Sequence, residues 1–235
     1  MISVCLAAYN GEKFIKEQLE SILHQLNIED EVLVSDDGST DNTLGIIEAF
    51  NDPRISIHRN SFSNPVSNFE YLINNAKGDF IFLSDQDDVW AIDKVQVYLE
   101  CFSQNPGVSL ILSDIQIVDK EGLVLNKEFY EQGFKTGLIQ NIITNNFIGC
   151  SMVFKQEIKK YILPFPKNLP MHDWWIGTCC ILFGKIHFIN KKLLSYRRHD
   201  NNFTKTAGSV ILKIKWRFNL VINLLFRFIK VKANS

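Results

Sequence analysis

Two aspartates with one residue between them follow an apolar segment in the first half of the chain. Residues 79–83 are mostly apolar, and residues 84–88 read Ser-Asp-Gln-Asp-Asp. This pattern predicts a buried strand of a parallel sheet, with Asp85 and Asp87 projecting to the same side. Two neighbouring carboxylates repel each other unless a cation lies between them, and Mg²⁺ favours oxygen ligands. The alternative is an acidic loop that caps a helix beginning near Asp93.

Apolar strands and amphipathic helices alternate around this pair. We predict strands at 2–8, 31–35, 55–58 and 79–83, and helices at 13–26, 42–50, 67–76 and 93–102. This order is typical of an α/β fold with a Rossmann-like, mostly parallel sheet and flanking helices. Ligands bind such sheets at the carboxyl ends of the strands, where the loops at Tyr9, Asp36 and Asp85 all lie. Their convergence favours the metal site over helix capping.

Composition indicates one enzyme-sized domain. The chain has 235 residues and a net charge of −1, which argues against nucleic acid as a bulk electrostatic partner. The five cysteines show no metal-binding spacing, so we expect reduced thiols in the core of a cytoplasmic protein. No signal-peptide pattern is visible at the N-terminus.

A second acidic pair follows the second predicted strand. Asp36 and Asp37 can accept hydrogen bonds from a nucleotide base or from ribose hydroxyls. Ser39 or Asp41 is expected to cap the next helix. Neither Gly-x-Gly-x-x-Gly nor Gly-Lys-Ser/Thr is present, so phosphate groups would need another counter-charge. A metal ion held by the first aspartate pair would supply it.

The second half contains three further chemical signals. Gly149 lies within a predicted strand at 146–154, where either a close approach or a bulge would require glycine. Residues 172–175 open an apolar helix that is expected to end near Phe183, and Asp173 at its start is either a helix cap or a catalytic base. His199 is either a metal ligand or part of a solvated basic loop, in which Arg197 or Arg198 could face a diphosphate.

Four segments, 4–10, 35–41, 78–79 and 85–88, together resemble family 2 glycosyltransferases with the GT-A fold. The resemblance covers about residues 1–205. Segments 85–90, 172–175 and 196–199 look most like a rhamnosyltransferase-like branch of bacterial polysaccharide assembly. The resemblance implies metal-dependent, inverting transfer of a sugar, with Mg²⁺ or Mn²⁺ as cofactor. The implied donor is a dTDP- or UDP-sugar, and the implied acceptor is a glycan or a lipid-linked glycan.

The resemblance and the residue patterns together assign roles to individual positions. Asp173 is the predicted base, because inverting transfer needs a group that accepts the acceptor's hydroxyl proton. The family more often has Glu before this position, so His172 either binds the acceptor or tunes Asp173. The remaining predictions are nucleotide-sugar binding by Ala7, Tyr9, Asp36, Asp37, Asp85, Gln86 and Arg198, metal binding by Asp87 and His199, and acceptor binding by Gly149, His172, Trp174 and Trp175. Core packing is the alternative for at least one of the two tryptophans.

The expected organisation is a nucleotide-sugar-binding half at 1–105, an acceptor-binding half at 106–205 and a basic amphipathic helix at 206–235. The tail carries six basic residues and no acid between 209 and 232, with apolar residues along one side. Its apolar runs are too short to span a bilayer. We expect it either to lie on the anionic inner face of the cell membrane or to dock on the body or on a partner subunit. The Gln-x-x-Arg-Trp motif of processive synthases is absent, which favours addition of a single sugar.

Two other classes of protein share part of this pattern. A sugar nucleotidyltransferase also places acids beside phosphates, but it would need a glycine-rich basic loop after the first strand, which residues 9–12 lack. A non-catalytic glycan-binding or scaffold module would not need the complete set of acids that this chain retains.

Overall fold

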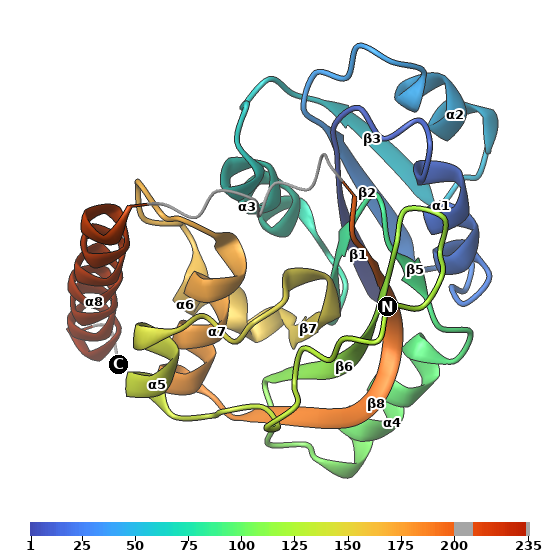
Figure 1. Ribbon diagram of the computed structural model, residues 1–235. Coiled ribbons are helices and arrows are strands. Elements are labelled where there is room, and N and C mark those ends of the chain that lie inside the picture. The colour runs from blue at the N-terminus through green and yellow to red at the C-terminus, as the bar shows by residue number, and fades with distance from the viewer. Residues whose placement is uncertain (200–208, 234–235) are drawn as a thin grey trace.

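The computed structural model describes residues 1–199 and 209–233, and eight strands of this part form one mixed sheet (Figure 1). The strand order is β3-β2-β1-β4-β7-β6-β8-β5. The neighbours β1–β2, β1–β4, β2–β3 and β6–β8 are parallel, whereas β7 and β5 pair antiparallel. The strands are β1 (Ile2–Ala8), β2 (Glu31–Asp36), β3 (Ile55–Arg59), β4 (Phe80–Asp85), β5 (Val89–Trp90), β6 (Leu110–Val118), β7 (Met152–Lys155) and β8 (Ile186–Arg197).

Helices cover both faces of this sheet, and the alternation of side chains along each strand creates two cores. In β1, Val4 and Leu6 pack with α1 (Ile15–Leu23), α2 (Thr43–Ala49) and α4 (Lys94–Gln104), whereas Cys5 packs with α3 (Pro65–Asn75) on the other face. The second core also contains α6 (Lys159–Ile162) and α7 (His172–Phe183). All five cysteines are buried free thiols, as predicted.

The predicted α/β order is confirmed, and the element boundaries differ by a few residues at most in the first half. The exception is the strand predicted at 146–154. Its first part is irregular, and Gly149–Ser151 forms a 3₁₀ turn before β7 begins at Met152. The Ser151 amide and hydroxyl both donate to the Ile148 carbonyl, and this local bonding replaces sheet pairing there.

Strand registers bring the chemically important loops together. Ala7 of β1 pairs with Asp85 of β4, and Ala8 pairs with Asp36 of β2. On the far side, β8 follows β6 with two register shifts near Asp114, and it ends at Arg197. The acidic loop after β4 and the end of β8 therefore meet, although more than 100 residues separate them in sequence.

The C-terminal helix α8 (Val210–Ala233) stands at one edge of the molecule, beside α5 (Leu138–Ile143) and α7 (Figure 1). It docks on the body through buried Leu220 and Leu224. The predicted boundary between body and tail, at 205–206, lies outside the described residues. None of the helices described combines the length and hydropathy that a membrane span requires.

Gly78 offers a test of the packing between β1 and the turn before β4. A Cβ added there would lie 2.4 Å from the Ser3 amide nitrogen and 2.6 Å from the Ile2 carbonyl carbon. We expect Gly78→Ala to lower the free energy of unfolding by about 1–3 kcal/mol, because the backbone of β1 must shift. Urea unfolding measures this change.

Gly107→Ala is the matched control, because a Cβ there would meet nothing within 4 Å. Equal stability of the two variants would show that β1 and the turn separate without cost.

Candidate active site

A cavity of about 1270 Å³ opens beside the carboxyl ends of β1, β2 and β4. It brings together side chains from both predicted halves of the chain. The predicted site residues that line it are Ala7, Tyr9, Asp37, Asp85, Gln86, Asp87, Gly149, His172, Asp173, Arg198 and His199. Asp36, Trp174 and Trp175 do not line it.

The loop after β1 is tied to the loops on either side of it. The Gln86 amide donates to the Tyr9 carbonyl at 2.8 Å and accepts from the Tyr9 amide at 2.7 Å. Asn10 accepts from the Thr40 amide, and its own amide donates to Ser39. These bonds hold three loops in one frame, which lowers the ordering cost of binding a ligand across them.

The two aspartates after β2 have different surroundings. Asp36 is only 1% exposed, and its Oδ2 accepts from the amides of Gly38 and Ser39. It therefore stabilises the turn, and the predicted contact with nucleotide is not available to it. Asp37 lines the cavity, and its carboxylate accepts from the backbone amides of residues 62–64.

Neither Ser39 nor Asp41 is the N-cap residue of α2. That position belongs to Asn42, and Asp41 Oδ1 instead accepts from the Thr43 amide at 3.0 Å. The Ser39 hydroxyl accepts from the Asn10 amide. Asp41 thus pairs the first amide of α2 from one residue before the N-cap position. Both side chains also link this loop to the loop after β1, because Asp41 Oδ2 accepts from the Glu12 amide.

Asp87 and His199 lie in contact at the cavity wall. Asp87 Oδ2 is 2.7 Å from His199 Nε2, and the His199 ring stacks on Phe14 with centroids 4.8 Å apart. The contact joins the loop after β4 to the segment after β8. The structure thus places the two predicted metal ligands side by side.

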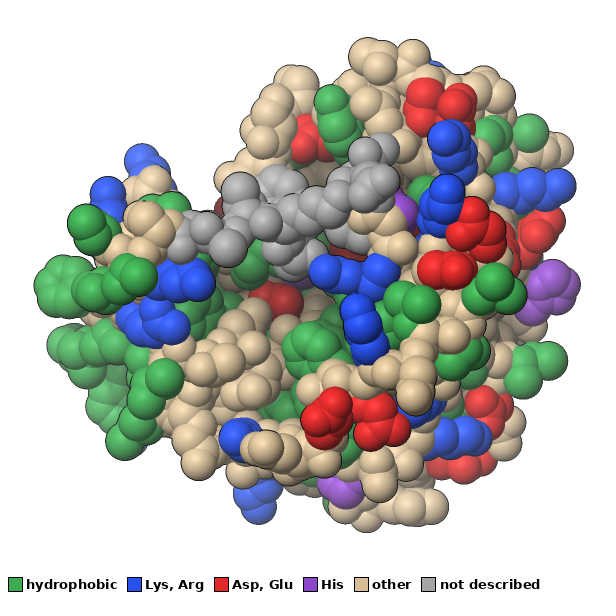
Figure 2. All heavy atoms as spheres, viewed as in Figure 1, with side chains coloured by type: hydrophobic (Ala, Val, Ile, Leu, Met, Phe, Trp, Pro, Cys, Tyr) green, Lys and Arg blue, Asp and Glu red, His purple; other side chains and the backbone are tan. Residues whose placement is uncertain are grey.

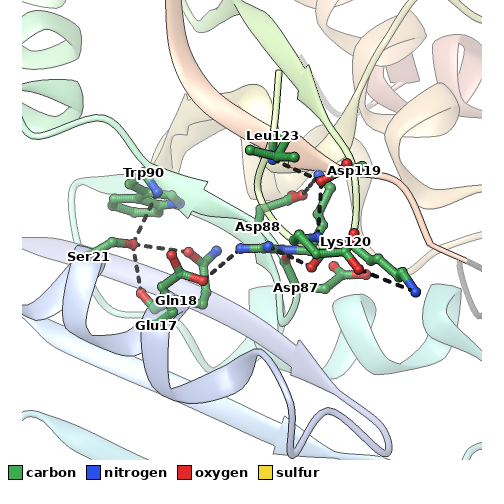
Figure 3. A network of polar contacts seen from close by, with 11 residues as sticks. Glu17, Gln18, Ser21, Asp87, Asp88, Trp90, Asp119, Lys120 and Leu123 are labelled. Carbon is green, nitrogen blue, oxygen red and sulfur yellow. Dashed lines mark hydrogen bonds and ion pairs between the residues drawn. The ribbon is translucent and has the colours of Figure 1, made fainter. Parts of the chain in front are cut away.

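Arg197 is the residue that holds these two segments together. Its guanidinium donates to the Asp87 carbonyl, the Lys120 carbonyl and the Glu17 carboxylate, and its own amide donates to Asp88 Oδ1. Figure 3 shows the surrounding network, in which Asp87, Asp88, Glu17 and Lys120 converge. Arg197 is 4% exposed and does not line the cavity, whereas Arg198 does. Of the two arginines predicted as diphosphate partners, Arg198 is therefore the one that lines the cavity.

Acidic side chains are concentrated at one end of the cavity, where Asp85 and Asp87 line it and Asp88 is buried. Burial, followed by the charges of Asp87 and Asp173, raises the pKa of Asp85 to about 7. Burial and the charge of Asp87 also raise the pKa of Asp88. The Lys94 ammonium is fully buried nearby and donates to the Cys150 carbonyl, and burial lowers its pKa to about 8. The carboxylates therefore favour a cation at this end of the cavity.

Two donor groups could hold that cation. Ligand atoms of Asp85, Asp88 and Cys150 lie within 4.8 Å of one another, but Asp88 and Cys150 are buried and do not line the cavity. Burial also raises the pKa of the Cys150 thiol, which disfavours the thiolate that a metal would need. Asp87 and His199 line the cavity and offer a carboxylate and an imidazole, which suit Mn²⁺ or Mg²⁺.

Asp173 lies on the cavity wall in the first turn of α7, whose N-cap residue is Met171. Its Oδ1 accepts from the Asn145 side chain at 3.0 Å and from the Trp174 amide at 2.6 Å. Burial raises the pKa of the Asp173 carboxyl to about 6, against the opposing effect of these bonds. A carboxyl that titrates near neutrality in a cavity is suited to proton transfer. The sequence did not point to Asn145, which lies in an irregular segment with no motif.

His172 is buried beside Asp173 as a neutral ring. It stacks on Phe69 at 3.9 Å between centroids, and burial lowers its pKa to about 3. Neither ring nitrogen has a hydrogen-bond partner among the described residues, although the ring lines the cavity. Gly149 leaves room for it, because a Cβ there would lie 2.6 Å from His172 Nε2. The close approach expected at Gly149 is thus made by a side chain.

Trp174 and Trp175 are core residues. Their indole nitrogens donate to the carbonyls of Asn141 and Ile162, and the two residues are 6% and 0% exposed. A turn of 100° per residue along α7 carries them away from the cavity that Asp173 faces. The predicted sugar-stacking surface is therefore not formed by these tryptophans, and core packing is their role.

Comparison with known proteins places this fold and cavity in one family. The model "Glycosyl transferase family 2" matches residues 3–162, which is more than half of the chain. The chain belongs to glycosyl transferase family 2 and is a glycosyltransferase. This membership excludes the nucleotidyltransferase and scaffold alternatives.

Three relatives illustrate the match. The dTDP-rhamnosyl transferase RfbG of Shigella flexneri is 30% identical over 94% of this chain and 81% of its own length. The glucosyltransferase WfgD of Escherichia coli is 28% identical over 74% of this chain and 68% of its own length. An uncharacterised protein of Mycobacterium tuberculosis is 24% identical, and the match spans 88% of this chain but 61% of that protein.

Solved structures of the same architecture include two that were determined with a bound nucleotide-sugar. S. aureus TarS in complex with UDP-GlcNAc has a TM-score of 0.72 at 19% identity, covering 96% of this chain and 72% of that one. The mannosyltransferase PcManGT of Pyrobaculum calidifontis, in complex with GDP-Man and Mn²⁺, has a TM-score of 0.62 at 17% identity, covering 100% and 64%. These likenesses confirm the GT-A fold.

Replacement of Asp87 tests the cation-binding end of the cavity. We expect Asp87→Ala to weaken Mn²⁺-dependent binding of dTDP or UDP by about tenfold or more, because a carboxylate ligand is lost. Isothermal titration calorimetry with and without Mn²⁺ measures the effect.

Asp79→Ala is the control, since Asp79 is exposed and outside the cavity. If Mn²⁺ increased nucleotide affinity equally in both variants, the cation would bind elsewhere.

Proposed function

We propose that this glycosyltransferase is metal-dependent and inverting, and that it adds one sugar to a glycan acceptor in bacterial surface polysaccharide synthesis. The observation that carries the proposal is the composition of the cavity. The Asp87–His199 pair, suited to a metal and a diphosphate, lines the same cavity as Asp173, a buried carboxyl suited to proton transfer. Nucleotide-sugar transfer with a base requires both.

The proposed donor is a dTDP- or UDP-sugar, with dTDP-rhamnose as the first candidate. RfbG is named as a dTDP-rhamnosyl transferase, and TarS was solved with UDP-GlcNAc. All six residues proposed for the donor line the cavity. In this proposal Asp37 would contact the base, with Ala7 and Tyr9 beside it, and Asp85 would contact the ribose. Gln86 would bind the nucleotide-sugar and Arg198 its diphosphate. The frame made by Gln86 and Tyr9 would hold this end of the donor in a defined position.

Asp87 and His199 would hold Mg²⁺ or Mn²⁺. When bound, the ion supplies positive charge that stabilises the departing nucleoside diphosphate. Arg197 keeps the two ligand-bearing segments together by bonding to the Asp87 carbonyl. The fully buried Lys94 offsets part of the charge of Asp85 and Asp88 from behind.

Asp173 would accept the proton of the attacking hydroxyl while the new glycosidic bond forms on the face opposite the leaving group. Its partner Asn145 orients the carboxylate. The neutral His172 ring, with both nitrogens unpartnered among the described residues, would hydrogen-bond the acceptor sugar. WfgD is named for a diphosphoundecaprenol-linked acceptor, which supports a lipid-linked glycan as acceptor here.

A donor panel tests the overall proposal. The purified chain is incubated with dTDP-rhamnose, UDP-glucose and UDP-GlcNAc, with Mn²⁺ or with EDTA, and release of free nucleoside diphosphate is measured. We expect one donor to be hydrolysed or transferred in the presence of metal. Turnover that persists unchanged in EDTA would remove metal dependence from the proposal.

Asp173→Asn tests the catalytic base. The amide keeps the shape but cannot accept the proton, so we expect kcat to fall by about 10²–10⁴-fold with donor affinity unchanged. Initial rates and calorimetric donor binding provide both values.

Asp114→Asn is the control, because that carboxylate lies outside the cavity. A kcat within a few-fold of wild type for Asp173→Asn would leave Asp173 as a structural residue of α7.

The pH dependence of kcat tests the same residue independently. Because burial raises the Asp173 pKa to about 6, the ionised base is lost as pH falls through this value. We expect kcat to rise with pH up to about 6 and then to level off.

Asn145→Ala removes a bond that stabilises the ionised form, so it should move this limb to higher pH. A limb that stays in place in the Asn145 variant would assign the titration to another group.

A further inference from the structure

The C-terminal helix α8 is docked with its polar side against the body. A helical repeat places the apolar residues 211, 214, 218, 225 and 229 on one side of α8 and residues 213, 217, 223, 227 and 230 on the other. The body contacts Leu220 and Leu224, which lie within the second side. The usual arrangement of a surface helix, with its apolar stripe inward, is therefore reversed.

Two arginines stabilise this orientation. Arg217 donates to the Ile143 carbonyl at the end of α5. Arg227 donates to the carbonyls of Tyr161, Leu163 and Pro164, and its guanidinium lies 5.3 Å from the centre of the Trp175 ring. All of these acceptors are main-chain carbonyls, so the bonds do not depend on which side chains the acceptor residues carry. The arginines are thus committed to docking the helix.

The apolar side of α8 consequently faces outward, as the green side chains along the left edge of Figure 2 show. Ile211 is 80% exposed, Phe226 65% and Ile229 62%. The other large apolar side chains exposed on the helix are Val210, Leu212, Ile214, Phe218, Leu225 and Phe228. A contiguous apolar surface of this kind marks an interaction site.

The charges around this surface indicate its partner. Lys213, Lys215, Lys230 and Lys232 are exposed, α8 contains no acid, and no ion pair is formed by these lysines among the described residues. A second copy of the chain docked by a two-fold axis would bring these lysines toward one another, with no acid to pair them. A bilayer instead receives the apolar groups. The same helical repeat places Lys215 and Lys232 beside the apolar side, where they meet the anionic headgroups, and the long exposed side chains of Lys213 and Lys230 extend toward the headgroups from the two ends of the docked side.

We propose that α8 is an in-plane anchor that binds the surface of an anionic lipid bilayer through its outward side. Its polar side stays bonded to the body, so the whole catalytic domain is held at a fixed orientation. The helix packs on α5 and α7, and α7 carries Asp173. If the proposed function holds, this orientation brings the acceptor side of the cavity near lipid-linked glycans. Binding to lipid itself does not depend on that function.

Vesicle co-sedimentation of the full chain tests the anchor. The vesicles are phosphatidylcholine alone or phosphatidylcholine with phosphatidylglycerol, each at low and high salt. We expect binding to the mixed vesicles at low salt, weakened by high salt and by the absence of phosphatidylglycerol. Binding that ignores both salt and lipid charge would overturn the electrostatic part of the proposal.

Two variants separate the contributions of charge and apolar surface. Replacing Lys213, Lys215, Lys230 and Lys232 by Gln should weaken binding by about 100-fold or more, because each basic group near such a surface contributes about fivefold. Replacing Phe218, Leu225, Phe226 and Ile229 by Ser should also weaken it, because these side chains would enter the lipid. All eight side chains are exposed, so both variants should keep the thermal stability of the parent.

A matched control carries Gln at four exposed lysines elsewhere, Lys16, Lys77, Lys120 and Lys185. It has the same net charge as the first variant and should bind like the wild type. Equal loss in control and variant would show only a net-charge effect and would overturn the proposal. So would a dimer in light scattering that the Ser variant converts to a monomer, because a second copy would then cover this face.

Discussion

Repulsion among the carboxylates at the end of β4 is the constraint on which the rest of the site depends. Asp85, Asp87 and Asp88 are brought together by a strand that must stay buried, so their charge cannot be relieved by moving apart. Two buried cationic side chains offset part of this repulsion. Lys94 lies behind the group and Arg197 beside it, and the position facing the cavity is left to a ligand cation.

Arg197 links the carboxylates after β4 to the far part of the sheet. It is the last residue of β8, yet it bonds to the loop after β4, to α1 through Glu17 and to the segment after β6 through Lys120. The contact between Asp87 and His199 can form because β8 ends beside the loop that follows β4. The antiparallel part of the sheet thus completes a site that the parallel part begins.

The two ends of the cavity are physically coupled. Asp173 belongs to a helix of the second core, but its charge contributes to the raised pKa of Asp85. A cation bound near Asp85 and Asp87 would therefore favour the ionised form of Asp173 as well. Binding of donor and metal would then favour the ionised form of Asp173 before the acceptor enters. The same helix α7 packs against α8, so the anchor, the core and the base share one element.

Local sequence patterns were sufficient for the order of strands and helices, the position of the acidic loops and the family resemblance. Alternation and helical spacing depend on neighbours in sequence, so they can be read without the fold. The same patterns could not decide between Asp36 and Asp37, between Arg197 and Arg198, or whether Trp174 and Trp175 face the cavity. Each of these depends on whether the side chain faces the cavity or the protein interior. That is decided by contacts with elements distant in sequence. The orientation of α8 is the clearest case, because its amphipathic pattern is the same whichever side docks. Contacts of Arg217 and Arg227 with carbonyls of α5 and α6–α7 decide it, and those carbonyls come into position only when the tertiary structure forms.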